Sequence, residues 1–249
     1  AGAYDVSVNW NDEVFTHIRY KNAPLERFRE FPAWRKLFYD DHAERGAAFI
    51  SISAADPDIF SDVEPKRLTE AGVSAGKALM EYRTRLMSNK NSWCVVSVPT
   101  PAWAHKVFPD VSADQAMERL WAEILKAVRI SAEEDPISAW MNHIDHLQKI
   151  TEFLNAHDFA ELHYTNCLGT DLHVELPPGH IWMGGAEKSA EGTLFAANLP
   201  TEEVYTLPKR NGVNGIVFAS KPLHYNGNLI HGFSLTFRDG KVVGYDAEQ

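Results

Sequence analysis

The sequence is poor in cysteine and contains no long apolar run, and both shortages restrict what the chain can be. Cys94 and Cys167 are the only cysteines among its 249 residues. A pair this sparse does not provide the disulfide framework of a small secreted domain, so we expect reduced thiols and a cytoplasmic location. No apolar stretch approaches the ~20 residues that a membrane-spanning helix needs, so a membrane protein is not expected.

The chain also lacks an excess of positive charge. Its formal net charge is −10, and it contains no Walker A stretch and no Gly-x-Gly-x-x-Gly stretch. Nucleic acid and anionic membranes both bind to basic faces, so neither is expected as a partner. The negative balance is compatible with divalent cations, or with a substrate that carries a cationic terminus.

Short apolar runs and amphipathic helices alternate through residues 1–158. Strands are expected at residues 4–10, 47–53 and 93–98. Helices are expected after the caps Asn11 or Asp12, Ser112 and Asp135, near residues 33–45 with Pro32 in the first turn, and as one long helix at 64–89. This alternation predicts an α/β domain with a mostly parallel sheet and right-handed crossovers.

Composition changes near residue 158, and residues 159–249 consist of short β-rich runs separated by Gly, Pro, Asn and Asp. No helix is evident there. Asn226-Gly227 and Asp239-Gly240 are dipeptides typical of tight hairpin turns. We expect an antiparallel β-rich domain that is incomplete at its C-terminal end, because the chain stops just after a predicted strand.

The stretch from Asn198 to Pro208 carries the main candidate site. Its residues Val204 to Thr206 favour a strand, on which Glu202 and Glu203 would point to opposite faces. Two interpretations remain open. Both glutamates lie in solvent on an edge strand, or one carboxylate points inward and requires a cation, a metal or hydrogen-bond donors.

Residues Asn198 to Thr206 resemble the signature of the thermophilic-type metalloaminopeptidase family, which includes aminopeptidases T and S. Further stretches resemble the same family in order along the chain: residues 5–13, 46–52, 99–104, 169–172, 180–185, 221–223 and 233–243. The resemblance therefore extends from one end of the chain to the other.

The resemblance implies a metal-dependent aminopeptidase that acts on peptides as a homodimer. It implies two divalent ions, with Glu203 as a metal ligand and no assigned role for Glu202. Zinc, cobalt, magnesium and manganese all suit carboxylate and imidazole ligands, so the metal stays open. The family's other ligands lie further along, in a Leu-Gly-Glu segment, a His followed by a Tyr, and a His-x-Asp pair.

Because this chain ends before those segments, we expect an internal fragment whose metal site is incomplete. Two alternatives remain for such a fragment. It could be a non-catalytic scaffold or dimerisation module, or an α/β domain that binds a small molecule.

Other polar residues have weaker patterns. His143 and His146 share a helix face that we expect to be solvated. His173 and Glu175 share a strand face, which allows a ligand pair but favours an outward polar surface. Asp171 is expected as a turn cap or a residue that shapes the site. The stretch 182–185 lines a pocket or holds a buried aromatic, and Cys94 belongs to the core.

Overall fold

Three parallel strands hold the first half of the chain together. A computed structural model describes residues 2–225 and 228–248. In it β1 (Phe49–Ser53) pairs with β2 (Trp93–Ser97) in parallel, and β8 (Asn198–Leu199) joins β2 on its other side. The α/β class is confirmed. The domain boundary predicted at residue 158 stays a prediction. Strand β8 lies after this boundary and hydrogen-bonds to β2, which lies before it.

Helices surround this sheet, and their ends follow local chemistry. They are α1 (Glu13–Asn22), the 3₁₀ helix η1 (Leu25–Phe28), α2 (Ala33–Glu44), α3 (Pro65–Ala78), α4 (Met80–Met87), α5 (Pro101–Val107), α6 (Ala113–Ala127) and α7 (Pro136–His157). The predicted caps Ser112 and Asp135 accept hydrogen bonds from the backbone N–H groups of Gln115 and Ser138. None of the helices in the described part of the chain is long and apolar enough to cross a membrane.

Two predicted elements of the first half are wrong. Residues 4–10 form no strand, and Val6, Val8 and Trp10 lie exposed. Alternating apolar residues form a strand only beside a partner edge, and none of the described strands pairs with them. The helix expected at 64–89 is divided into α3 and α4, because the backbone departs from helical geometry at the buried Leu79.

The core of the first half is small and partly polar. Phe28 is fully buried and stacks on Tyr20 at 5.1 Å between ring centroids. The buried Asn91 amide donates to the carbonyls of Ala43 and Ala47, which ties the end of α2 to the approach to β1. Such pairing removes the cost of burying an amide.

Apart from β8, which pairs in parallel with β2, the strands of the second half are antiparallel, as predicted, and its described residues contain no helix after α7. One sheet has the order β14-β13-β10-β4-β3, from β3 (Glu161–Thr165), β4 (Asp171–Glu175), β10 (Val213–Phe218), β13 (Ser234–Arg238) and β14 (Lys241–Asp246). Three two-stranded pairs accompany it: β5 (Met183–Gly184) with β9 (Val204–Tyr205), β6 (Glu187–Lys188) with β7 (Leu194–Phe195), and β11 (Leu223–Tyr225) with β12 (Asn228–Ile230).

The two predicted turns have different outcomes. Asp239 and Gly240 join β13 to β14 with φ angles of 51° and 73°, which is the hairpin turn that the dipeptide predicts. Asn226-Gly227 lies outside the described residues. Residues 180–182 are one of the β-rich runs from which a strand is predicted, and this prediction is wrong, since the nearest strand begins at Met183.

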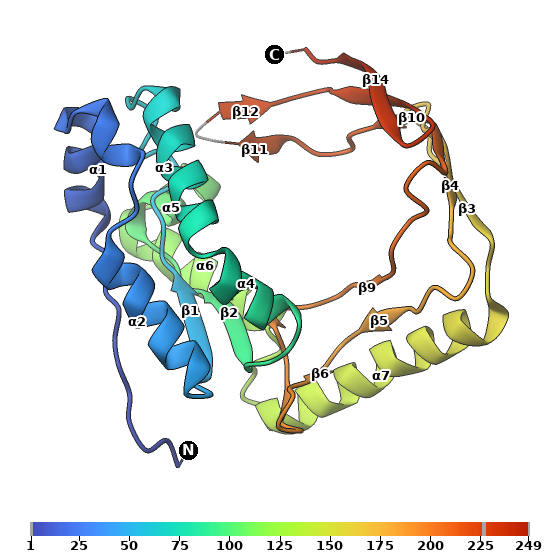
Figure 1. Ribbon diagram of the computed structural model, residues 1–249, viewed down its shortest axis with the longest axis horizontal. Coiled ribbons are helices and arrows are strands. Elements are labelled where there is room, and N and C mark those ends of the chain that lie inside the picture. The colour runs from blue at the N-terminus through green and yellow to red at the C-terminus, as the bar shows by residue number, and fades with distance from the viewer. Residues whose placement is uncertain (1, 226–227, 249) are drawn as a thin grey trace.

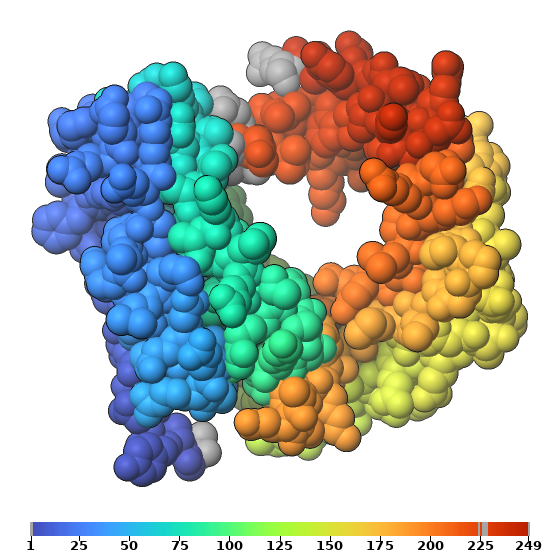
Figure 2. All heavy atoms as spheres, viewed as in Figure 1, coloured from blue at the N-terminus to red at the C-terminus, as the bar shows by residue number. Residues whose placement is uncertain are grey.

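Together the elements form a ring (Figure 1). The parallel sheet and its helices occupy one side, α7 runs along another, and the five-stranded sheet with the β11–β12 pair completes the circuit. Figure 2 shows that the side chains leave the centre of this ring open. The β5–β9 pair borders the opening (Figure 1), so the residues just before β9 lie close to it.

Candidate functional site

The segment that contains Glu202 and Glu203 connects two sheets. It leaves the parallel sheet after β8 and enters the β5–β9 pair at Val204, which pairs with Gly184. The expected strand is therefore confirmed only over Val204 and Tyr205, because residues 200–203 have no strand partner among the described residues. A Cβ atom at Gly184 would lie 2.8 Å from the Glu203 carbonyl oxygen, so glycine permits this close approach.

Glu202 meets a cation from another element. The Arg129 guanidinium donates to both carboxylate oxygens of Glu202, at 2.6 and 2.9 Å. This charge-assisted bidentate contact lowers the pKa of the Glu202 carboxyl. Arg129 also lines two shallow hollows beside α6, one of them together with His143 and the other together with Glu202.

Glu203 is exposed, and it lines neither of these hollows. Among residues 2–225 and 228–248, no hydrogen bond or ion pair reaches its carboxylate. The inward burial of one glutamate is not seen, since both residues are exposed. No cation from the described residues contacts the Glu203 carboxylate, so its oxygens are available to a metal ion. The role of Glu203 as a metal ligand stays a prediction.

The prediction of a solvated helix face holds for His146 and is wrong for His143. His146 lies exposed on α7. The His143 side chain is only 9% exposed, and its Nε2 donates to the buried Thr201 carbonyl oxygen at 2.7 Å. His143 therefore anchors the segment before Glu202, a contact between residues 58 positions apart.

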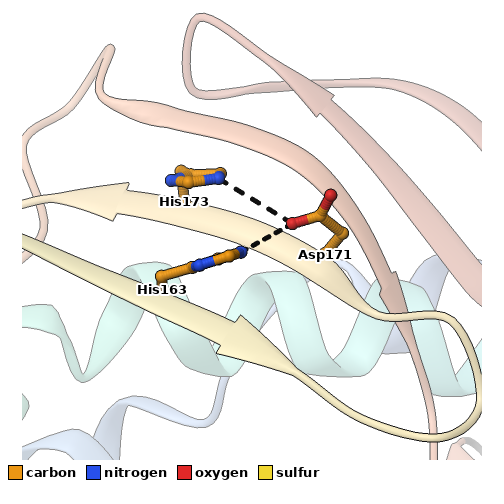
Figure 3. A group of neighbouring side chains, drawn as sticks. All are labelled: His163, Asp171 and His173. Carbon is orange, nitrogen blue, oxygen red and sulfur yellow. Dashed lines mark hydrogen bonds and ion pairs between the residues drawn. The ribbon is translucent and has the colours of Figure 1, made fainter.

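A second group of polar side chains lies on the β3–β4 hairpin, and Figure 3 shows its three members. His163 Nε2 is 2.6 Å from the Asp171 Oδ1 atom, and His173 Nε2 is 3.8 Å from the same oxygen. The pairing of His173 with Glu175 is not formed, because Glu175 contacts Lys209 instead. His163 was not recognised in the sequence, although its cross-strand position opposite His173 would indicate it once the hairpin is known.

The remaining candidates have structural roles. Cys94 lies partly buried in β2, and this burial raises the pKa of its thiol, which disfavours a reactive thiolate. Trp182 donates its backbone N–H to Asn155 on α7. The sequence also contains an unpredicted Gly-x-Ser-x-Gly stretch at 72–76. It lies inside α3 rather than at the strand-to-helix turn of a nucleophilic serine, and its Ser74 hydroxyl contacts the Phe28 carbonyl oxygen.

Comparison with known proteins identifies the family. Residues 1–249 match the model of the thermophilic metalloprotease (M29) family. The chain belongs to this family.

Relatives of this M29 chain are named aminopeptidases. It is 48% identical to Aminopeptidase 2 of Geobacillus stearothermophilus and 44% identical to Aminopeptidase AmpS of Bacillus subtilis (strain 168), in each case over all of this chain and 60% of the relative. A solved structure of wild-type AmpT from Thermus thermophilus superposes with a TM-score of 0.88 at 34% identity, covering 98% of this chain and 59% of that one. The chain spans about three fifths of the length of these relatives.

Membership of the M29 metalloproteases raises the question of whether the described residues suit a metal. The exposed carboxylate of Glu203 suits one coordination position, because carboxylate oxygen is a common ligand of divalent ions. The one cluster of three metal-ligating side chains in the described residues is His163, Asp171 and His173, and it does not include Glu203. Glu203 is therefore a fitting ligand that needs further partners.

Proposed function

We propose that this chain serves in a metal-dependent aminopeptidase that releases N-terminal amino acids from peptides. The observation that carries the proposal is the 48% identity to Aminopeptidase 2 along the entire chain. The M29 match over residues 1–249 supports the metal dependence. A peptide with a free, cationic N-terminus also agrees with the net charge of −10.

In this proposal Glu203 contributes a carboxylate ligand to a pair of divalent ions. Bound ions of this kind supply a water with a lowered pKa and polarise the scissile carbonyl group. Zinc, cobalt, magnesium and manganese all suit such a ligand. The family resemblance implies further ligands in segments that these 249 residues do not include, so we expect the 249-residue chain alone to be inactive.

The neighbours of Glu203 position it. Glu202 is held by Arg129, and Thr201 is held by His143, so the chain is anchored immediately before Glu203. Pairing of Val204 with Gly184 anchors it immediately after. A ligand held on both sides keeps its carboxylate near one place, which metal coordination requires.

The test compares the substitutions Glu203→Gln and Glu202→Gln in the enzyme that contains this chain. Hydrolysis of an aminoacyl-arylamide should fall with a chelator and return with a divalent ion. Glu203→Gln should lower kcat by about 100-fold or more, because even outer-shell changes cost 10–100-fold at metal sites. Glu202→Gln removes a charge from an exposed ion pair worth roughly 0–1 kcal/mol, so activity should remain within about tenfold.

Two outcomes would contradict the proposal. Full activity of the Glu203→Gln enzyme would show that Glu203 is not a metal ligand. Hydrolysis that is insensitive to the chelator would show that the reaction does not depend on a metal ion.

Location and assembly belong to the same proposal. We place the enzyme in the cytoplasm, and the free thiols of Cys94 and Cys167 support a reducing compartment. The family resemblance supports a homodimer.

A further inference from the structure

The β3–β4 hairpin brings two imidazoles and a carboxylate to one point on the surface. His163 and His173 are direct cross-strand partners, and their rings stack with centroids 4.0 Å apart and planes 14° apart. The Asp171 carboxylate lies beside the edges of both rings (Figure 3). One ligand atom from each of the three residues lies within 4.8 Å of the other two.

Sheet geometry explains why these residues meet. Side chains two positions apart on a strand share a face, so Asp171 and His173 project to the same side of β4. In an antiparallel pair the side chains of direct and diagonal partners are close, which adds His163. The register His163↔His173 and Thr165↔Asp171 therefore places all three on one face of the sheet.

A fourth residue orients one of the imidazoles. His173 Nδ1 lies 2.8 Å from the Glu161 Oε1 atom and donates its proton to that carboxylate. In the neutral imidazole of His173 the lone pair is then on Nε2, the nitrogen that lies 3.8 Å from Asp171 Oδ1. In metal sites a ligand histidine usually donates its other ring N–H to a carboxylate in this way, which fixes the orientation of the ring.

We propose that His163, Asp171 and His173 bind a divalent transition-metal ion of the Zn²⁺ class, through the two Nε2 atoms and the Asp171 carboxylate. Imidazole ligands favour Zn²⁺, Co²⁺, Ni²⁺ or Cu²⁺ over Mg²⁺ and Ca²⁺, which prefer oxygen ligands. Ligand atoms about 2.0–2.2 Å from a tetrahedral ion lie roughly 3.4 Å apart. The observed separations of 2.6 and 3.8 Å lie on either side of this value.

Small rotations of these side chains are sufficient to reach that geometry. The side chains of His163, His173 and Asp171 are 47%, 45% and 68% exposed, so solvent supplies a fourth ligand and access is open. On binding, neutral His163 takes the tautomer with its proton on Nδ1, so its Nε2 lone pair faces the ion in place of the hydrogen bond to Asp171. The bound ion crosslinks the edge strand β3 to β4.

This site is distinct from the one assigned to Glu203. It lies on the β3–β4 hairpin, whereas Glu203 immediately precedes β9, and Glu203 does not belong to the cluster. The inference goes beyond the proposed peptidase function, and a zinc titration of the 249-residue chain tests it without any reading of hydrolysis.

The experiment is a calorimetric titration of the chelator-treated chain with Zn²⁺, repeated with Co²⁺ and followed by visible absorption. His163→Ala and His173→Ala should each remove one bound ion per chain, together with the tetrahedral Co²⁺ spectrum. Glu161→Gln should weaken Zn²⁺ binding by about 10–100-fold while it keeps the stoichiometry. His146→Ala removes an exposed histidine on α7 and should leave binding unchanged.

The near-isosteric Asp171→Asn separates loss of a ligand from loss of the fold. It should weaken binding while the circular dichroism spectrum stays that of the parent chain. Unchanged Zn²⁺ affinity in folded His173→Ala would overturn the proposal. An equal loss of binding in His146→Ala, or the absence of Zn²⁺ binding by the parent chain, would overturn it as well.

Discussion

Asp62 illustrates how a single surface charge is tuned by its neighbours. Its carboxylate accepts from Lys21 Nζ at 2.5 Å and contacts His17 Nε2 at 2.6 Å, both from α1. Hydrogen bonds from Lys21 and then His17 lower the pKa of Asp62 from 3.8 to about 2. Lys21 and His17 lie four residues apart on one helix face, so their contacts with Asp62 connect α1 to the loop before α3.

This pKa predicts a pH-dependent contribution to stability. Because the folded state holds the Asp62 pKa below its unfolded value, the contribution is present above about pH 3.8 and is lost as pH falls toward 2. The urea midpoint of the parent chain should therefore decline more steeply across this window than that of Asp62→Asn. Superimposable pH profiles for the two proteins would show that the ion pairs do not act on folding.

At the level of elements, the β13–β14 hairpin depends on one glycine. Gly240 has a φ of 73°, and a Cβ atom there would lie 1.9 Å from the Arg210 carbonyl oxygen. Only glycine avoids both the backbone strain and this overlap. The turn thus sets the register that places β13 beside β10 in the five-stranded sheet.

Gly240→Ala should destabilise the chain by about 1–3 kcal/mol, because it forces a side chain into a left-handed and crowded position. Gly244→Ala is a matched control on β14, where the added Cβ would meet Thr236 at an ordinary 3.6 Å. Thermal or urea unfolding measures both. Equal stability of the two variants would contradict the strain assigned to Gly240.

At the scale of the whole molecule, the ring is joined by contacts between distant parts of the chain. His143 on α7 donates to Thr201, and Arg129 before α7 pairs with Glu202. Strand β8 adds to the parallel sheet at the same place. These contacts attach the segment before Glu203 to the first half of the chain, so the proposed ligand is positioned by residues from both halves.

His143→Ala should cost about 1–3 kcal/mol of folding free energy, because the buried Thr201 carbonyl oxygen loses its donor. His146→Ala, on the exposed face of the same helix, should change stability by no more than about 0.5 kcal/mol. Chemical denaturation compares the two. The contact would be shown to be unimportant if both variants unfolded at the same denaturant concentration.

Local chemistry allowed a substantial part of this structure to be predicted. Ser112 and Asp135 start helices because their side chains satisfy nearby N–H groups, and Asp239-Gly240 turns because its backbone tolerates positive φ. The family was also readable from residues 198–206 and the matches around them. In each case the information lies within a few neighbouring residues or in their order.

Other features depend on partners that are distant in sequence. Residues 4–10 alternate like a strand but have no partner edge, and His143 is buried only because Thr201 lies 58 positions away. The imidazoles of His163 and His173 meet through strand register, which hydrophobic periodicity alone does not specify. The sequence by itself determined most element types, the caps Ser112 and Asp135, the Asp239-Gly240 turn and the family. Only the tertiary structure decided which polar side chains meet, because their contacts form when distant segments close on one another.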